Sequence, residues 1–392
     1  MSAESEAQSK QTKLGLMRMH KGRLVVLHAA FGLTGVLHAI GGALLPAIAA
    51  SFELSDSRSG TLFLCYYLGT PLGALVCVGR YVRLLTAGFL LTAAVCWGIA
   101  AGSPGMLPVL FFAMGVGVGI PMTAVSMYAG RAFAGQTAAP LTLLNFTWSA
   151  GALAAPLLAA RVLTGHGWRT AYWLLAAAAA VVAVACWVGL QEPPEEATVV
   201  AAERETGSRM GQWGVVALFA FLAFLEVGIE NTTATWLASY AMRAASTGAA
   251  KAAASSSLYW CGFLVSRGLF ALLLTRMNAM RVLSVMVVAA LVAAGALVGF
   301  MNAAPVAMLL LGAALAPVFP LLISRFFARA QVKHLRWVLS VSGFGGSVLP
   351  WATGQISSSA NSLRLGLCTV PAALVVMICL LPLVQVRQRT DA

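Results

Sequence analysis

The chain has 392 residues, of which 60% are hydrophobic and only 9% are charged. Ordinary soluble domains carry about 25% charged residues, and a soluble fold could not cover this much apolar surface. The composition therefore excludes an ordinary soluble protein. The formal net charge of +13 would suit nucleic acid, but the basic residues follow the predicted membrane topology instead, so we expect no nucleic-acid partner.

Long apolar runs dominate the chain from residue 23 onward. Runs of about 18 or more apolar residues are typical of transmembrane helices, and the alternation of barrel strands is absent. No small-residue cleavage site accompanies the first run, which predicts a retained helix rather than a signal peptide. The expected fold class is an all-α membrane protein with twelve transmembrane helices. The predicted spans lie near residues 23–50, 58–79, 82–101, 105–129, 137–160, 169–190, 212–241, 254–275, 280–300, 304–324, 335–357 and 363–386.

The most polar interior stretch, QEPPEEATVVAAERETGSRMGQ at 191–212, divides the spans six and six. Pro193 and Pro194 would close the sixth helix. With both termini on one side, 18 of the 25 Lys and Arg residues lie on that side, six lie on the other, and Arg267 lies within a span. The positive-inside rule then predicts that both termini are cytoplasmic. The predicted organisation is a cytoplasmic segment 1–22, a six-helix bundle 23–190, a cytoplasmic linker 191–211, a second six-helix bundle 212–386 and a cytoplasmic tail 387–392.

The two halves share residues at a nearly constant offset. Internal duplication is typical of secondary transporters, whose binding site lies between the repeats near the middle of the membrane. The pattern therefore predicts two pseudo-symmetric bundles with a central site. The matching pairs are Cys65 and Cys261, Arg80 and Arg276, and Pro121 and Pro317 at an offset of 196, and Gly151 and Gly345, and Pro156 and Pro350 at an offset of 194.

Twelve spans in two sets of six resemble the major facilitator superfamily. Its signature loop between the second and third helices reads Gly-x-x-x-Asp-Arg-x-Gly-Arg, and the stretch here is GALVCVGRYVR at 73–83. Arg80 and Arg83 remain, but the acid of this loop is missing. We expect structural or gating roles for Arg80, Arg83 and Arg276.

Three stretches resemble one group of that superfamily, the fucose–galactose–glucose:proton symporters. FLEVGIENTTATWLASY is similar to the group's seventh helix, with Gly228, Glu230 and Trp236 at its Gly-x-Glu and Trp positions. LNFTWSAGALAAPLLA at 144–159 resembles the fifth helix, and GALLPAIAASFELS at 42–55 resembles the end of the first. Gly42 stands where the group has an acid, and the fourth helix also lacks its acid. The resemblance implies sugar–proton symport with Glu230 as the coupling carboxyl.

Glu226 and Glu230 are the only two of the twelve acids that lie deep in a span. Their spacing puts both side chains on one helical face, and intramembrane ionisable residues usually mark a pathway. Burial and like charge favour the neutral acid, so the pair should titrate as one coupled unit. We favour a coupling role for Glu230. For Glu226 a coupling role and a structural hydrogen bond are equally open.

His38 is either a partner of Glu230 or a structural residue. Arg267 either pairs with an acid or snorkels, and a structural role is favoured.

A sugar site needs a few convergent polar groups and aromatic walls. Buried amides also join helices, and tryptophans favour membrane interfaces, so each candidate has a structural alternative. The candidate substrate-binding residues are Asn145, Trp148, Asn231, Trp236, Tyr259, Trp260, Trp351 and Gln355.

The sequence therefore predicts a secondary active transporter that takes up a neutral hexose with protons by alternating access. The seven cysteines lack metal-type spacing and no nucleophile constellation occurs, so we expect neither an enzyme with catalytic residues nor a metal site or cofactor. Sodium as the coupling ion stays open, because Asn231 and Thr232 beside the carboxyl could supply oxygen ligands. Alternatives are a proton-coupled exporter of drugs or metabolites and an uncoupled sugar carrier. The expected partners are a sugar and the lipid bilayer, for a multi-pass monomer in the bacterial inner membrane.

Overall fold

The computed structural model describes residues 3–132, 139–193, 209–273, 277–331 and 334–384. These residues are almost entirely helical, and no strand occurs among them. The predicted linker lies mostly outside the described residues. The first half contains α1 (Ala3–Phe52), α2 (Asp56–Leu75), α3 (Tyr81–Ala101), α4 (Leu107–Ala132), α5 (Ala139–Gly165) and α6 (Trp168–Gly189). The second half contains α7 (Arg209–Ala244), α8 (Ala249–Leu273), α9 (Ala279–Gly299), α10 (Ala304–Leu315), α11 (Val318–Phe327), α12 (Leu335–Ala360), α13 (Leu363–Gly366) and α14 (Thr369–Leu380).

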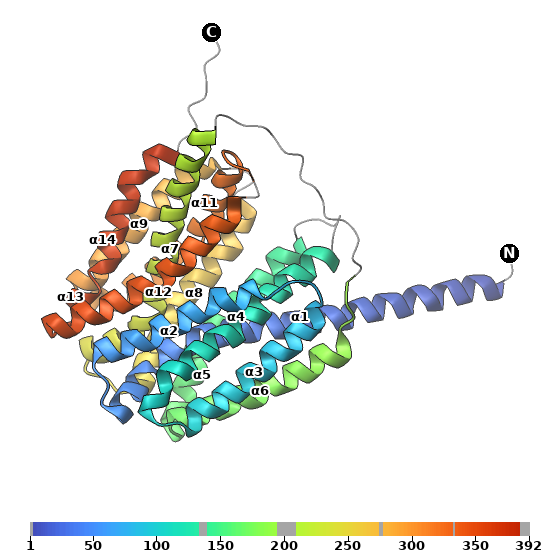
Figure 1. Ribbon diagram of the computed structural model, residues 1–392, viewed down its shortest axis with the longest axis horizontal. Coiled ribbons are helices and arrows are strands. Elements are labelled where there is room, and N and C mark those ends of the chain that lie inside the picture. Colours follow the sequence, from blue (N-terminus) through green and yellow to red (C-terminus); the bar gives the residue numbers. More distant parts are fainter. Residues whose placement is uncertain (1–2, 133–138, 194–208, 274–276, 332–333, 385–392) are drawn as a thin grey trace, which may run out of the picture.

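The helices agree with the twelve predicted spans, with two interruptions that the sequence analysis did not predict. The tenth span is divided into α10 and α11, and Pro317 is the N-cap residue of α11. The last span is divided into α13 and α14. α1 also begins far before the predicted span, at Ala3, and its first turns project from the molecule (Figure 1).

Nine segments of the described chain are long and apolar enough to cross a membrane. The remaining long helices, α2, α8 and α12, are richer in serine, threonine and glycine. α2 packs against α12, and α8 packs against α5. The more polar helices therefore lie at the boundary between the two halves, where Figure 1 shows α2 beside α12.

The two halves repeat the same helix pairs. In the first half, α1 packs on α5, α2 on α4 and α3 on α6, and in the second half α7 packs on α12, α8 on α10 and α9 on α14. A Cβ built on Gly115 would lie 1.9 Å from the Tyr66 carbonyl oxygen, and one on Gly312 would lie 1.9 Å from that of Tyr259. Glycine lets each pair of helices approach closely. The equivalent contacts confirm the predicted pseudo-symmetry of the bundles.

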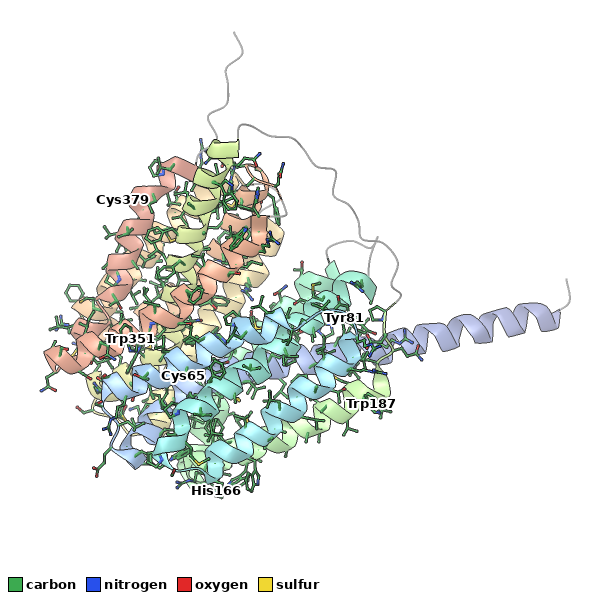
Figure 2. All side chains as sticks on the ribbon, viewed as in Figure 1. Cys65, Tyr81, His166, Trp187, Trp351 and Cys379 are labelled. Carbon is green, nitrogen blue, oxygen red and sulfur yellow. The ribbon has the colours of Figure 1, made fainter. Side chains whose placement is uncertain are left out.

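The interface between the halves has two ends. We call the end where α6 ends and α7 begins the linker end, and the end where α1 joins α2 and α7 joins α8 the opposite end (Figure 1). Apolar side chains on the outer faces are exposed, as for Trp187 and Cys379 in Figure 2. Such a surface suits contact with lipid rather than water.

Candidate functional site

Six aromatic side chains meet midway between the two ends. His38 comes from α1, Trp148 from α5 and Trp260 from α8. The ring centroids of His38 and Trp148 are 5.3 Å apart, and those of Trp148 and Trp260 are 5.9 Å apart. Since α5 and α8 belong to different halves, these rings join the halves. The central aromatic cluster consists of His38, Tyr66, Tyr67, Trp148, Tyr259 and Trp260.

The two glutamates of α7 lie at this depth. Glu226 is 1% exposed, and neither of its carboxylate oxygens has a hydrogen-bond partner among the described residues. Glu230 is half-buried. Both carboxylates lie within electrostatic reach of Arg267 on α8, and Glu230 also lies within reach of Tyr67. The predicted pair therefore faces the interface between the halves rather than lipid.

Arg267 crosses from the second half to the first. Its guanidinium donates a hydrogen bond of 3.0 Å to the Ser149 hydroxyl on α5. The guanidinium carbon lies 5.6 Å from the centre of the Trp148 ring and 4.6 Å from that of Phe263. These contacts hold the cation between the halves by hydrogen bonding and cation–π attraction. Arg267 thus neither snorkels away from the interface nor forms a close salt bridge within the described chain.

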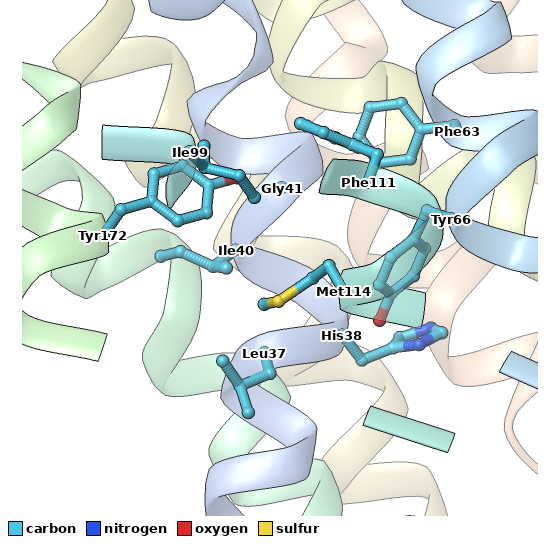
Figure 3. Close-up of a pocket in the computed structure, with 10 residues that line it drawn as sticks. All are labelled: Leu37, His38, Ile40, Gly41, Phe63, Tyr66, Ile99, Phe111, Met114 and Tyr172. Atoms are coloured by element: carbon cyan, nitrogen blue, oxygen red, sulfur yellow. The ribbon is translucent and has the colours of Figure 1, made fainter. Parts of the chain in front are cut away.

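Several buried polar atoms around the cluster lack partners in the described part of the chain. They are His38 Nε2, Tyr66 Oη, Trp148 Nε1, Tyr259 Oη and both carboxylate oxygens of Glu226. A buried polar atom without a hydrogen bond costs free energy, so such atoms usually have water or a ligand beside them. In Figure 3 the Tyr66 hydroxyl and the His38 ring point toward one another beside a cavity of about 10 Å³. That space is close to what one water molecule needs.

A large cavity of about 880 Å³ lies between the halves toward the linker end. Ligand pockets span roughly 300–1,000 Å³ and combine apolar walls with a few polar groups. Arg267 and Asn145 supply polar groups here, and most of the wall is apolar. The lining residues are Thr142, Leu143, Asn145, Phe146, Arg267, Gly268, Phe270, Ala316, Pro317, Phe319 and Pro320.

At the opposite end the halves are held together by direct polar contacts. The two terminal guanidinium nitrogens of Arg243 donate to the Asp56 carboxylate, at 2.7 and 2.5 Å, and the Ser357 hydroxyl donates to it at 2.5 Å. Ser57 donates from its hydroxyl to Gln355 Oε1 at 2.8 Å. Burial works against the charge of Asp56, but the hydrogen bonds from Arg243 and Ser357 and the Arg243 charge outweigh it and lower the pKa of this carboxyl. We call Asp56, Ser57, Arg243, Gln355 and Ser357 the opposite-end latch.

Glycine gives the halves their closest approach just below this latch. A Cβ built on Gly42 of α1 would lie 2.0 Å from the Ala234 carbonyl oxygen of α7. The Tyr67 and Thr235 hydroxyls share a hydrogen bond of 3.2 Å nearby. These contacts separate the central aromatic cluster from the opposite end.

The structure brings together most of the predicted central residues. Glu226, Glu230 and Arg267 lie around one region, and Asn145 lines the large cavity. The predicted His38, Trp148, Tyr259 and Trp260 belong to the central aromatic cluster.

Four predicted substrate-binding residues lie elsewhere. Asn231 donates to the Gly346 carbonyl at 3.3 Å, and the Trp236 indole donates to the Pro350 carbonyl at 3.0 Å, so both join α7 to α12 within one half. Gln355 belongs to the opposite-end latch, and the Trp351 backbone abuts Gly60 of α2. A polar group in an apolar helix takes the nearest carbonyl, and spacing alone does not show which neighbour provides it.

The predicted gating arginines lie at the linker end. Arg80 and Arg83 are exposed at the start of α3, and Arg276 lies outside the described residues. The signature loop lacks its acid, and Cys77 is buried there. Glu192, which follows α6, instead accepts a hydrogen bond of 3.0 Å from the Val82 amide in the first turn of α3. An acid at the start of the linker thus stabilises the N-terminus of α3.

Several residues around the site are not indicated by the sequence. Tyr66 and Tyr67 are adjacent in an apolar span, a pattern also typical of ordinary core packing. Asp56 and Arg243 flank spans that are far apart in the sequence, so nothing indicated that they pair. Among the described residues no three His, Cys, Asp or Glu side chains come together as a metal site requires.

Comparison with known proteins identifies one family. Residues 27–334 match the family described as the Major Facilitator Superfamily. Among curated protein sequences, none matches the chain closely enough to count as a relative.

Solved structures share the fold at low sequence identity. A variant of the nucleoside transporter NupG is 12% identical, with a TM-score of 0.74 over 92% of this chain and 99% of that one. A bacterial homolog of the human lysosomal transporter Spinster, inward-facing and unoccupied, is 15% identical, with a TM-score of 0.68 over 93% and 95%. The transporter FucP in its outward conformation is 18% identical, with a TM-score of 0.61 over 93% and 98%.

Proposed function

The chain belongs to the Major Facilitator Superfamily and is a multi-pass membrane transporter rather than an enzyme, and from this premise we propose that it takes up a neutral hexose together with protons. Glu230 is the coupling carboxyl in this proposal. The observation that supports this proposal most directly is the pair of carboxylates on α7. The pair lies between the halves beside Arg267 and the central aromatic cluster.

The surroundings of the pair suit a carboxyl that gains and loses a proton. Glu226 is fully buried without a hydrogen-bond partner in the described chain, which favours its neutral form. Glu230 is half-buried and closer to the opposite end along α7. Arg267 carries one positive charge, which can balance one ionised carboxylate but not two. The favoured state of the pair is therefore one ionised carboxylate and one protonated carboxyl. Losing or gaining a proton changes the net charge between the halves.

The central aromatic cluster supports a neutral ring-shaped substrate. Aromatic faces pack on the apolar side of a sugar ring, and the unpartnered Trp148 indole and Tyr259 hydroxyl can bind its hydroxyls. A nucleoside also combines hydroxyls with a planar ring, so the substrate panel should include one.

Alternating access accounts for the unequal ends. The opposite end is closed by the latch and by the Gly42 contact, while the linker end holds the large cavity. If the termini are cytoplasmic, as the basic residues predict, this conformation faces inward. Protons and substrate would each shift the balance only by their differential affinity for the two conformations.

The test is uptake of labelled hexoses and one nucleoside into proteoliposomes, with and without an inward proton gradient. The parent should accumulate one compound when the gradient is present. Glu230→Gln should lose accumulation but keep exchange of the same compound, since binding would persist without coupling. Glu53→Gln, at an exposed acid after α1, is the matched control and should behave as the parent. Equal accumulation by Glu230→Gln would remove Glu230 from coupling.

One observation favours a second candidate, a proton-coupled exporter of apolar metabolites or drugs. Leu143, Phe146, Phe270 and Phe319 make the large cavity mostly apolar. An exporter would show no gradient-driven accumulation of any hexose or nucleoside. It would instead accumulate an apolar dye inside inverted vesicles, and Glu230→Gln would abolish this accumulation.

A further inference from the structure

A second, smaller cavity lies behind the opposite-end latch. Its volume is about 210 Å³, and its walls come from α1 and α2 of the first half and α7 of the second. Pro46 and Ala49 line it on α1, and Trp236 lines it on α7. The close approach of Gly42 to Ala234 separates it from the large cavity. We call this space the latch cavity.

The chemistry of the latch cavity is specific. Seven of its eleven lining residues are apolar, and Ser59 and Ser239 contribute hydroxyls. Ser59 is 1% exposed, and its hydroxyl has no hydrogen-bond partner in the described chain. Asp56 and Arg243 also line it, but they already neutralise one another. A charged ligand would therefore gain little, while an uncharged group that hydrogen-bonds to Ser59 would satisfy a buried polar atom.

The size limits the ligand further. An apolar cavity of about 150 Å³ is known to hold benzene, so about 210 Å³ accommodates one ring with a short polar arm. We propose that the latch cavity binds a small uncharged amphiphile, with one apolar ring or short chain and one hydroxyl or carbonyl group, and that this ligand holds the opposite end closed. Hexoses, which carry hydroxyls all around the ring, do not match these apolar walls.

The ligand would hold the opposite end closed because both halves of the protein form the walls of the latch cavity. Because both halves contribute, separation of the halves at this end dismantles the cavity. A ligand that binds one conformation only stabilises that conformation. A ligand that holds this end closed would inhibit transport only if the protein works by alternating access, which is part of the function proposed above. Binding itself depends on neither the proposed substrate nor the proposed coupling ion.

Benzyl alcohol is a suitable probe, because it has one ring and one hydroxyl. Its binding to purified protein in deuterated detergent is measured by saturation-transfer NMR, and closure is followed by hydrogen exchange of residues 52–60. We expect saturable binding that slows exchange in this segment. Ala49→Phe, which fills the cavity, should abolish both effects. Ser59→Ala, which removes only the hydroxyl, should weaken binding roughly two- to ten-fold, as the loss of one hydrogen bond predicts.

Two further variants keep the test specific. Ala29→Phe makes the same change at an exposed position of α1 and should bind as the parent, which accounts for partition into the micelle. Gly42→Ala lies outside the lining but should abolish binding by forcing the halves apart. Equal binding by Ala49→Phe and Ala29→Phe would overturn the site. Binding that leaves exchange of residues 52–60 unchanged would overturn the effect on closure, and neither result depends on hexose transport.

Discussion

The two ends of the interface between the halves differ in chemistry as well as in separation. The opposite end is held by a carboxylate–guanidinium pair, three further polar side chains and a glycine contact. The linker end instead has a cavity of about 880 Å³ with mostly apolar walls and one arginine. The closed end thus combines short polar contacts with close packing at glycine. The open end displays the surface that a substrate would meet.

The middle of the molecule lies between these two ends and contacts both halves. The central aromatic cluster, Arg267 and the two glutamates lie between the large cavity and the Gly42 contact. A change of charge there can therefore act on both ends. Substitutions that weaken one region at a time should separate the contributions of the centre and the closed end.

The largest effect is expected at the centre, for Arg267→Met. Its loss removes the hydrogen bond to Ser149, two cation–π contacts and the cation near Glu226 and Glu230, which together should cost roughly 2–3 kcal/mol in free energy of unfolding. Combining it with Glu226→Gln should recover part of this loss, which a double-mutant cycle in a denaturing-detergent titration measures. Arg161→Met, at an exposed arginine of α5, should cost little. Strictly additive losses would show that Arg267 and Glu226 do not interact.

The next largest effect is expected at the closed end, for Gly42→Ala. The new methyl group would lie 2.0 Å from the Ala234 carbonyl oxygen, so α1 must move away from α7. Overpacking of this kind costs roughly 1–3 kcal/mol, which would shift the balance of conformations by about 5- to 150-fold. Hydrogen exchange of residues 52–60 should accelerate accordingly. Gly22→Ala, on the same helix with open space around it, should leave that exchange unchanged.

A smaller effect is expected for Asp56→Asn in the opposite-end latch. Arg243 is 46% exposed, so solvent screens the pair, and such ion pairs contribute about 0.2–1 kcal/mol. Exchange of residues 52–60 should rise by at most about five-fold. The control is Glu53→Gln, which removes an exposed acid three residues away. An effect as large as that of Gly42→Ala would mean that charge, not close packing, holds this end together.

The smallest effect concerns pH. The pKa of Asp56 is lowered when the latch is closed. The stabilisation of the closed end by Asp56 is therefore complete above the ordinary aspartate pKa of about 3.9, and it is lost as pH falls through the lower pKa that Asp56 has in the closed latch. Between pH 8 and pH 5 the difference in closure between the parent and Asp56→Asn should be constant. Below about pH 4 it should shrink toward zero. A difference that already disappears near pH 6 would require another titrating group.

The fold could be predicted from the sequence because each membrane helix makes its backbone hydrogen bonds within itself. The length and apolarity of a segment therefore suffice to identify it as a span. The sequence does not indicate that the tenth span divides at Pro317, although Pro317 is one of the positions that match between the halves. Its equivalent, Pro121, lies inside the unbroken α4. A proline in an apolar run can either kink or end a helix, and only the neighbouring helices determine which occurs.

The candidate site was most predictable where an ionisable residue lies deep in a span, and only some of the predicted aromatic and amide residues lie there. Glu226, Glu230 and Arg267 stood out because ionisable groups rarely occur deep in a membrane. Asn231 and Trp236 satisfy their polar atoms with backbone carbonyls of α12, and that choice depends on helix rotation. Tyr66 and Tyr67 were missed because their aromatic rings look like ordinary core residues until the other half is placed beside them.

The contact between Gly42 and Ala234 also constrains how this chain can evolve. Position 42 is where the resembling symporters carry an acid on the first helix, and any side chain there would collide with the α7 backbone in the closed conformation. An acid could return to α1 only after the backbone at Ala234 had moved, and each step alone would impair closure. Close homologues that keep this packing of α1 on α7 should therefore keep glycine at position 42.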